Sequence, residues 1–138
     1  MTTLHLAIET SLAFITRTGP VMIETRFKPG VRITPAGMIE NIRVRREMCR
    51  NVPHVMLTVI EGEHDIDPDL MRTDLFHMPE DRAVIKAVAL VIDGNFLQQV
   101  ASIYFSYFPQ TFRTQVFGEE EAARRWLHEE ALVIARII

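Results

Sequence analysis

The residues with the clearest potential for chemistry form an acidic loop between Ile60 and Leu70. Five carboxylates and one imidazole fall within nine positions: Glu61, Glu63, His64, Asp65, Asp67 and Asp69. Oxygen ligands of this kind bind divalent cations, and the loop follows an apolar run, where ligands often sit in α/β sheets. The spacing departs from the EF-hand pattern, and the loop has no second histidine for zinc. The alternative, which we favour, is helix capping by these carboxylates.

Three arginines form a second candidate site, a basic stripe on one predicted helix. Arg43, Arg46 and Arg50 are three to four residues apart and therefore share one side of a helix. Such a stripe could bind a phosphate or an acidic protein partner. The alternative, again favoured, is a solvated face on which Glu40 and Glu47 pair with the arginines, each pair contributing about 0.3–0.5 kcal/mol.

The single cysteine, Cys49, follows these arginines, but it shares a helical line with Met38 and Ile42. We therefore expect an inert thiol packed in the core. No serine lies in a nucleophile-elbow motif, no histidine is tied to the cysteine, and the six glycines never cluster into a phosphate loop. The sequence thus favours a protein that is not an enzyme and that needs no cofactor.

The elements that must position these residues follow the order ββαβαβαβα. Predicted strands cover residues 4–16, 21–27, 54–60, 87–92 and 112–117, and predicted helices cover 34–51, 67–76, 95–107 and 119–127. The run 87–92 is apolar without alternation, which is typical of a central strand covered by helices on both faces. Thr34 and Asn95 are the expected N-caps. The fold class is therefore α/β, a single domain with a mixed sheet and covering helices.

Composition agrees with one globular domain. The chain has 138 residues, 48% hydrophobic and 24% charged, which suffices to bury a core. A net charge of −3 gives no general attraction to nucleic acid or anionic lipid. One cysteine excludes an internal disulfide. No signal peptide and no apolar run of about 20 residues is present, so we expect a cytoplasmic protein without membrane insertion or a nucleic-acid partner.

The element order and the segment Val116–Leu127 resemble the SpoIIAA-like, or STAS, domains. The residues that carry the likeness are Phe117, Ala122 or Ala123, and Trp126-Leu127. The resemblance implies a mixed sheet with helices packed against it. It also implies a non-enzymatic regulatory or protein-interaction role, as in the anti-anti-sigma factors.

One family feature does not carry over. Anti-anti-sigma members are switched by phosphorylation of a Ser or Thr at the start of the helix after the second core strand. The corresponding segment 60–69 has no hydroxyl group, and its carboxylates would repel a phosphate. We therefore assign no switch residue.

The C-terminal residues 128–138 form an apolar extension of the domain. If the last helix continues, Glu130 falls on its apolar face. An unpaired buried carboxylate is costly, so either the helix breaks near residues 128–130 or Glu130 meets a basic partner. The apolar residues of this tail are Leu132, Val133, Ile134, Ile137 and Ile138. We predict that they pack on a second subunit, giving a homodimer.

Two hypotheses for function follow. The favoured one is a small regulatory or protein-interaction module whose protein partner is unknown. The alternative is a protein that binds a small ligand or a divalent metal, using either the loop 61–69 or an apolar pocket beneath the aromatic helix. The aromatic residues in question are Phe96, Tyr104, Phe105, Tyr107, Phe108 and Phe112. Core packing is the favoured explanation for these aromatics.

Overall fold

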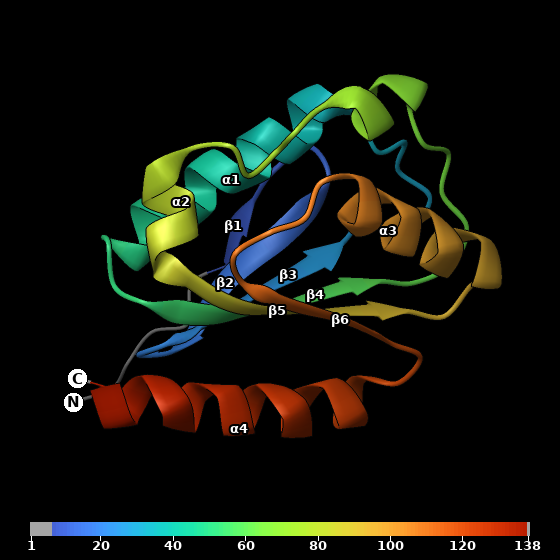
Figure 1. The fold of residues 1–138 in the computed structure, drawn as a ribbon. Coiled ribbons are helices and arrows are strands. Elements are labelled where there is room, and N and C mark those ends of the chain that lie inside the picture. Colours follow the sequence, from blue (N-terminus) through green and yellow to red (C-terminus); the bar gives the residue numbers. More distant parts are fainter. Residues whose placement is uncertain (1–6, 138) are drawn as a thin grey trace.

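A six-stranded mixed sheet organises the protein in the computed structural model, which describes residues 7–137 (Figure 1). The strands are β1 (Ala7–Glu9), β2 (Ala13–Gly19), β3 (Met22–Phe27), β4 (His54–Ile60), β5 (Ile85–Ile92) and β6 (Arg113–Phe117). They lie in sequence order across the sheet. The strands β1, β2 and β3 pair antiparallel, whereas β3 to β6 pair parallel. The predicted fold class is confirmed.

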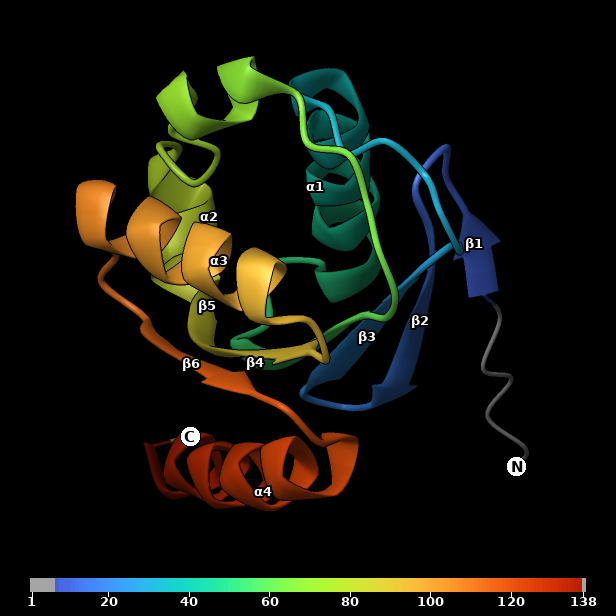
Figure 2. The same cartoon turned by 90° about the vertical axis from the view of Figure 1, so that its right-hand side faces the viewer.

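Helices cover both faces of the sheet, but unequally. They are α1 (Pro35–Cys49), the 3-10 helix η1 (Pro68–Arg72), α2 (Pro79–Val84), α3 (Asn95–Tyr107) and α4 (Glu120–Ile137). The elements α1, η1, α2 and α3 lie on one face, and α4 lies alone on the other (Figures 1 and 2). Among the described residues, no helix is long and apolar enough to cross a membrane.

Strand β5 shows why the central strands are apolar throughout. Val88, Leu90 and Ile92 pack toward α1 and α3, and Ala87 and Ala89 pack toward α4. Successive side chains of a strand point to opposite faces, and both faces are covered here. The burial predicted for the run 87–92 is confirmed.

The predicted strand 4–16 is instead two strands; its residues 4–6 lie outside the described range. Thr10 separates β1 from β2, because its Oγ1 accepts hydrogen bonds from the amides of Leu12 (3.3 Å) and Ala13 (3.0 Å). A side chain that bonds nearby amides in this way turns the backbone. The alternating apolar pattern carried no sign of this break.

The crossover from β4 to β5 also differs from the prediction. The segment predicted as a helix over 67–76 holds only the short η1, and the α-helix is α2, where a loop was predicted. Pro79 begins α2, as suits a first helical residue. Asp81 in its first turn meets arginines of α1, so tertiary contacts decide where this helix forms.

The predicted helix ends at Thr34 and Asn95 have different outcomes. Thr34 Oγ1 accepts from the amide of Gly37 at 3.0 Å, which confirms it as the N-cap of α1. For α3 the cap is Gly94, without a side-chain bond, and Asn95 is the first helical residue. Gln98, the expected capping-box partner, donates to the carbonyl of Ile92 at 2.5 Å instead.

Helix α4 is continuous past Glu130, and it packs the tail onto its own sheet. Arg113 of β6 places its Nε 3.0 Å from Glu130 Oε1, so the carboxylate has the basic partner that a continuous helix requires. Ile134 is buried against β4 and β5, and is therefore a core residue of this chain rather than a surface for a partner. Leu132 and Val133 are exposed. The side chain of Ile137 and all of Ile138 lie outside the described residues.

Candidate functional site: a cavity between α1, α3 and the sheet

A cavity of about 130 Å³ lies between the sheet and the helices α1 and α3. Its walls are mainly apolar and include Met56, Leu90, Leu97 and Val100. The size approaches that of an engineered cavity of about 150 Å³ in another protein, which stays dry and binds benzene. The pocket that the sequence suggested beneath the aromatic helix is therefore present. Of the aromatics named there, Tyr104 and Phe105 line it.

Tyr104 links α3 to the segment before α2. Its hydroxyl donates to the carbonyl of Thr73 (2.7 Å) and accepts from the amide of Leu75 (2.9 Å). Burial raises the pKa of Tyr104 above its ordinary value of 10.0. Tyr104 is thus neutral, and its two hydrogen bonds connect α3 to residues 73–75 beside the cavity.

Asn41, on the inner side of α1, lines the cavity, and its Nδ2 group is buried. Only 7% of the residue is exposed. Its Oδ1 accepts from Thr10 Oγ1 at 2.6 Å. Thr10 Oγ1 accepts two backbone amides, and its single hydrogen has two possible acceptors, Asn41 Oδ1 and, at 3.2 Å, the carbonyl of Ala13. The Asn41 Nδ2 group has no hydrogen-bond partner.

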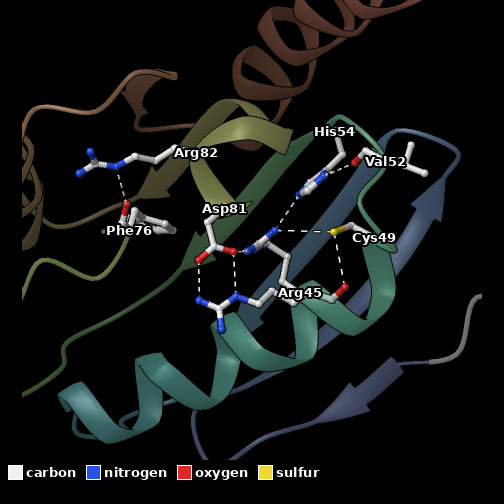
Figure 3. A network of polar contacts seen from close by, with 8 residues as sticks. Arg45, Cys49, Val52, His54, Phe76, Asp81 and Arg82 are labelled. Atoms are coloured by element: carbon white, nitrogen blue, oxygen red, sulfur yellow. Dashed lines mark hydrogen bonds and ion pairs between the residues drawn. The ribbon is translucent and has the colours of Figure 1, made fainter. Parts of the chain in front are cut away.

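Arg45, one turn further along α1, also lines the cavity and is 1% exposed. One terminal nitrogen, Nη2, donates to Asp81, and Nη1 lies 3.4 Å from His54 Nε2 and 3.8 Å from Cys49 Sγ (Figure 3). The remaining group, Nε, has no partner. Two residues from successive turns of α1 thus line the cavity, and each carries a buried N–H group without a partner.

Asp81 joins α2 to α1 through two arginines (Figure 3). Arg46 binds it in a bidentate pair, with Nε 2.9 Å from Oδ1 and Nη2 2.7 Å from Oδ2, and Arg45 binds the same Oδ1. Burial alone would raise the pKa of Asp81, but the hydrogen bond from Arg46 and both positive charges hold it below its usual value. Two guanidinium groups share one carboxylate, so this cluster retains a positive charge.

His54 completes the network in its neutral form. Burial lowers its pKa to about 4, and the charge of Arg45 acts in the same direction. The ring Nδ1 lies 2.8 Å from the carbonyl of Val52 and must donate to it. Because Arg45 can only donate, Nε2 of His54 is the acceptor.

The three arginines of the predicted basic stripe do not form one exposed surface. Arg46 joins the Asp81 cluster, whereas Arg43 and Arg50 are exposed. Cys49 is 3% exposed, which confirms its predicted place in the core. Sequence reasoning missed Arg45 and Asp81. A signal was available for Arg45, because it lies on the same helical line as Met38, Ile42 and Cys49, where a charge needs a buried partner.

The acidic loop serves mainly local structure. Asp67 Oδ1 accepts from the amide of Asp69 at 2.9 Å and caps η1, as the capping alternative predicts. Asp69 pairs with Arg72. The ring of His64 lies between the carbonyl oxygens of Val31 (2.8 Å) and Glu61 (2.9 Å). Within residues 7–137, no three His, Cys, Asp or Glu side chains are arranged to bind a metal ion.

Part of that loop borders a second, more polar hollow. Its volume is about 640 Å³, and Glu63, His64 and Asp65 line it together with the start of α3. It lies at the carboxyl ends of β4 and β5, where ligands often bind in α/β sheets. We find no unsatisfied buried group in its lining among the described residues, so the cavity under α3 is the stronger candidate site.

The fold defines the class of protein, a SpoIIAA-like α/β domain. A crystal structure of an uncharacterised protein with this fold, from the DUF3478 family of Shewanella loihica PV-4, superposes with a TM-score of 0.54. The alignment covers 92% of this chain and 98% of that chain at 15% sequence identity, and at this identity the likeness shows the fold alone. The chain itself belongs to the family described as domain of unknown function DUF7793, whose model matches residues 18–131. No curated protein matches its sequence.

Proposed function

We propose that this protein binds a small apolar ligand in the cavity under α3, without converting it chemically. The cavity itself carries the proposal: it is mainly apolar, is of the size of a small organic molecule, and has a few polar residues in its lining. Ligand sites are generally concave and apolar with a few polar groups that orient the ligand. The polar residues in the lining are Thr25, Asn41, Arg45, Thr58 and Tyr104. That set contains no nucleophile paired with a base, which supports binding without catalysis.

The test measures the binding of toluene to the full chain, by calorimetry and by changes in backbone amide chemical shifts. We expect saturable binding, with shifts concentrated at Leu90, Leu97 and Val100. Ala101, which also lines the cavity, supplies the control, because Ala101→Leu fills the space. Binding that survives this substitution, or no binding to either protein, would refute the proposal.

The interaction module implied by the family resemblance is the second candidate, with a second copy of this chain as the partner. The observation that favours it is the outer face of α3, where Phe96, Ile103 and Tyr107 are 71%, 58% and 72% exposed. Helix α3 contains no charged residue, so two copies can approach without like-charge repulsion. Exposed apolar surfaces of this kind often mark interfaces.

Sedimentation velocity separates this surface from the tail predicted from the sequence. Ile103→Lys changes the α3 face, and Val133→Lys changes the exposed part of α4. A wild-type dimer that only Ile103→Lys dissociates supports the α3 interface, and one that only Val133→Lys dissociates supports the tail. A wild-type monomer at all concentrations rules out the homodimer.

A further inference from the structure

We infer that ligands enter the cavity between α3 and residues 70–76, and that the hydroxyl group of Tyr104 controls this entrance. The inference rests on the proposed function and adds how access to the same cavity is regulated. Its starting point is that both hydrogen bonds of this hydroxyl cross from α3 to the backbone beside the cavity, at Thr73 and Leu75.

One wall of the cavity differs from the others in its secondary structure. The sheet contributes Leu90, α1 contributes Ile42 and α3 contributes Leu97. Another wall is the segment 66–76, whose only helix is the short η1 and which contributes no strand to the sheet. Figure 2 shows η1 over the space between α1 and α3. Segments with little regular backbone hydrogen bonding open locally at a lower free energy than the helices and strands of a core.

Partly exposed lining residues mark two places where solvent can reach the cavity. The first comprises residues of η1 and α3, namely Met71, Val100, Ala101 and Phe105. The second comprises residues of β3, α1 and the loop before η1, namely Phe27, Met38 and Ile66. The bonds that hold the segment at each place decide which of the two is the entrance.

Backbone bonds hold the segment at the second place. The amide of Ile33 donates to the carbonyl of Asp65 at 2.8 Å, and the amide of Asp67 donates to the carbonyl of Ile33 at 2.9 Å. At the first place, the two bonds of the Tyr104 hydroxyl are the only hydrogen bonds between α3 and residues 66–76 in the described chain. Separating the segment from α3 therefore breaks no backbone–backbone bond.

Arg82 of α2 keeps the segment attached on its other side. Its Nε donates to the carbonyl of Phe76 at 2.7 Å (Figure 3), and its Nη2 donates to Asp74 Oδ2 at 3.3 Å. Leu75 and Phe76 line the cavity and are buried. When the Tyr104 bonds break, the segment thus moves away from α3 while its end next to α2 stays in place.

The hydroxyl acts on the rates of ligand exchange rather than on affinity. Without it, the Thr73 carbonyl and the Leu75 amide lack a partner in the closed form, whereas water solvates them in the open form. The free energy of opening decreases by the same amount with and without ligand, because the partners of the hydroxyl are backbone groups of the protein. Entry and exit therefore become faster by the same factor, and the dissociation constant does not change.

The experiment measures the exchange of toluene with the full chain by NMR relaxation dispersion at pH 7. In Tyr104→Phe we expect the association and dissociation rate constants each to rise about tenfold, the equilibrium factor that corresponds to one net hydrogen bond. The dissociation constant should stay unchanged. Tyr107→Phe is the matched control, since Tyr107 lies on the same helix and is 72% exposed, and its rates should equal those of the wild type.

Hydrogen exchange of the ligand-free wild type gives a second measurement that needs no variant. The amide of Leu75, which donates to Tyr104, should exchange at least about tenfold faster than that of Leu90 in the central strand β5, because the segment opens without unfolding of the sheet. Equal exchange rates at the two amides would mean that the segment opens only when the whole domain unfolds, and would overturn the inference.

The outcomes separate the entrance from the proposed function. If toluene binds the wild type but its exchange is no faster in a folded Tyr104→Phe protein, the entrance is wrong and the cavity stands as a binding site. Faster exchange in Arg82→Gln but not in Tyr104→Phe would place the entrance next to α2 and overturn the inference. A wild-type protein that does not bind toluene would refute the proposed function and the entrance with it.

Discussion

The two faces of the sheet are built from the same strands, yet they pack very differently. On the α4 side, β5 presents the small residues Ala87 and Ala89, which let the helix approach closely, and Leu127 and Ala123 are fully buried there. On the α1–α3 side, β5 presents Val88, Leu90 and Ile92, which are larger than alanine, but the covering helices leave a cavity. The α4 face fills its space, and the other face retains room for a ligand.

Charges are also distributed differently on the two faces. Near α4, the carboxylate of Glu24, only 10% exposed, pairs with Arg124, whose side chain is 41% exposed. Near α1, the carboxylate of Asp81 and the guanidinium of Arg45 are both 1% exposed. Solvent thus reaches one partner of the first pair and neither partner of the second, so the first is the more strongly screened. One face therefore consists of closely packed side chains, while the other combines a fully buried ion pair with the cavity that carries the proposed function.

The largest expected effect comes from removing one carboxylate charge on each face. Asp81→Asn leaves two guanidinium groups, one fully buried, without their anion, and should lower the free energy of unfolding by about 3–5 kcal/mol. Glu24→Gln, the matched change, should cost about 1 kcal/mol because its partners reach solvent. Urea unfolding at pH 7 measures both. Equal losses of unfolding free energy would contradict the contrast between the fully buried ion pair of Asp81 and the partly exposed ion pair of Glu24.

The buried histidine should make the cavity side sensitive to mild acid. The pKa of His54 is about 4 in the folded protein, against an ordinary value of 6.5. As pH falls from about 6.5 to about 4, the unfolded chain takes up a proton that the folded chain does not, so the free energy of unfolding decreases. The full decrease is on the order of 3 kcal/mol.

His54→Gln should flatten this part of the stability profile, measured by urea unfolding at several pH values. His77→Gln, at an exposed position, is the control and should leave the wild-type slope in place. An unchanged slope in the His54 variant would show that other groups cause the acid sensitivity.

The same enlargement of an alanine should have opposite effects on the two faces. Ala89→Leu forces extra volume under α4, where the residue is 0% exposed, and should destabilise by about 1–3 kcal/mol. Ala101→Leu fills part of the cavity and should be neutral or stabilising by up to about 1 kcal/mol. Thermal unfolding compares the two. A strong loss of stability in Ala101→Leu would mean that the cavity cannot accept added volume.

The smallest effect is expected at the edge of the α4 face. Arg113 pairs with Glu130 at 3.0 Å and lies 5.8 Å from the ring centre of Trp126. The side chain of Arg113 is 70% exposed, but that of Glu130 is only 12% exposed. Arg113→Ala should therefore cost about 1–2 kcal/mol, because it leaves the Glu130 carboxylate without its cation, and less at high salt. A loss that salt does not alter would indicate that packing on Trp126 outweighs the ion pair.

Sequence reasoning succeeded where local pattern decides structure and failed where distant partners decide it. The apolar run of β5 and the Thr34-Pro35 start of α1 could be predicted because each depends on neighbouring residues. The position of α2 could not, since Asp81 is held by arginines 35 and 36 residues earlier in the chain. The sequence left open whether the last helix breaks near Glu130 or continues with a basic partner for it. That partner is Arg113, a residue of another element.

The sequence by itself therefore determined the class of fold, the order of its main elements and the burial of Cys49. Tertiary structure alone decided the size and lining of the cavity and which buried N–H groups of α1 lack a partner. The physical reason is that periodicity and capping are properties of neighbouring residues, whereas an empty volume and an unsatisfied N–H exist only between elements packed together. Arg45 shows both levels, because its place on an apolar helix line is visible in the sequence, and its partners are not.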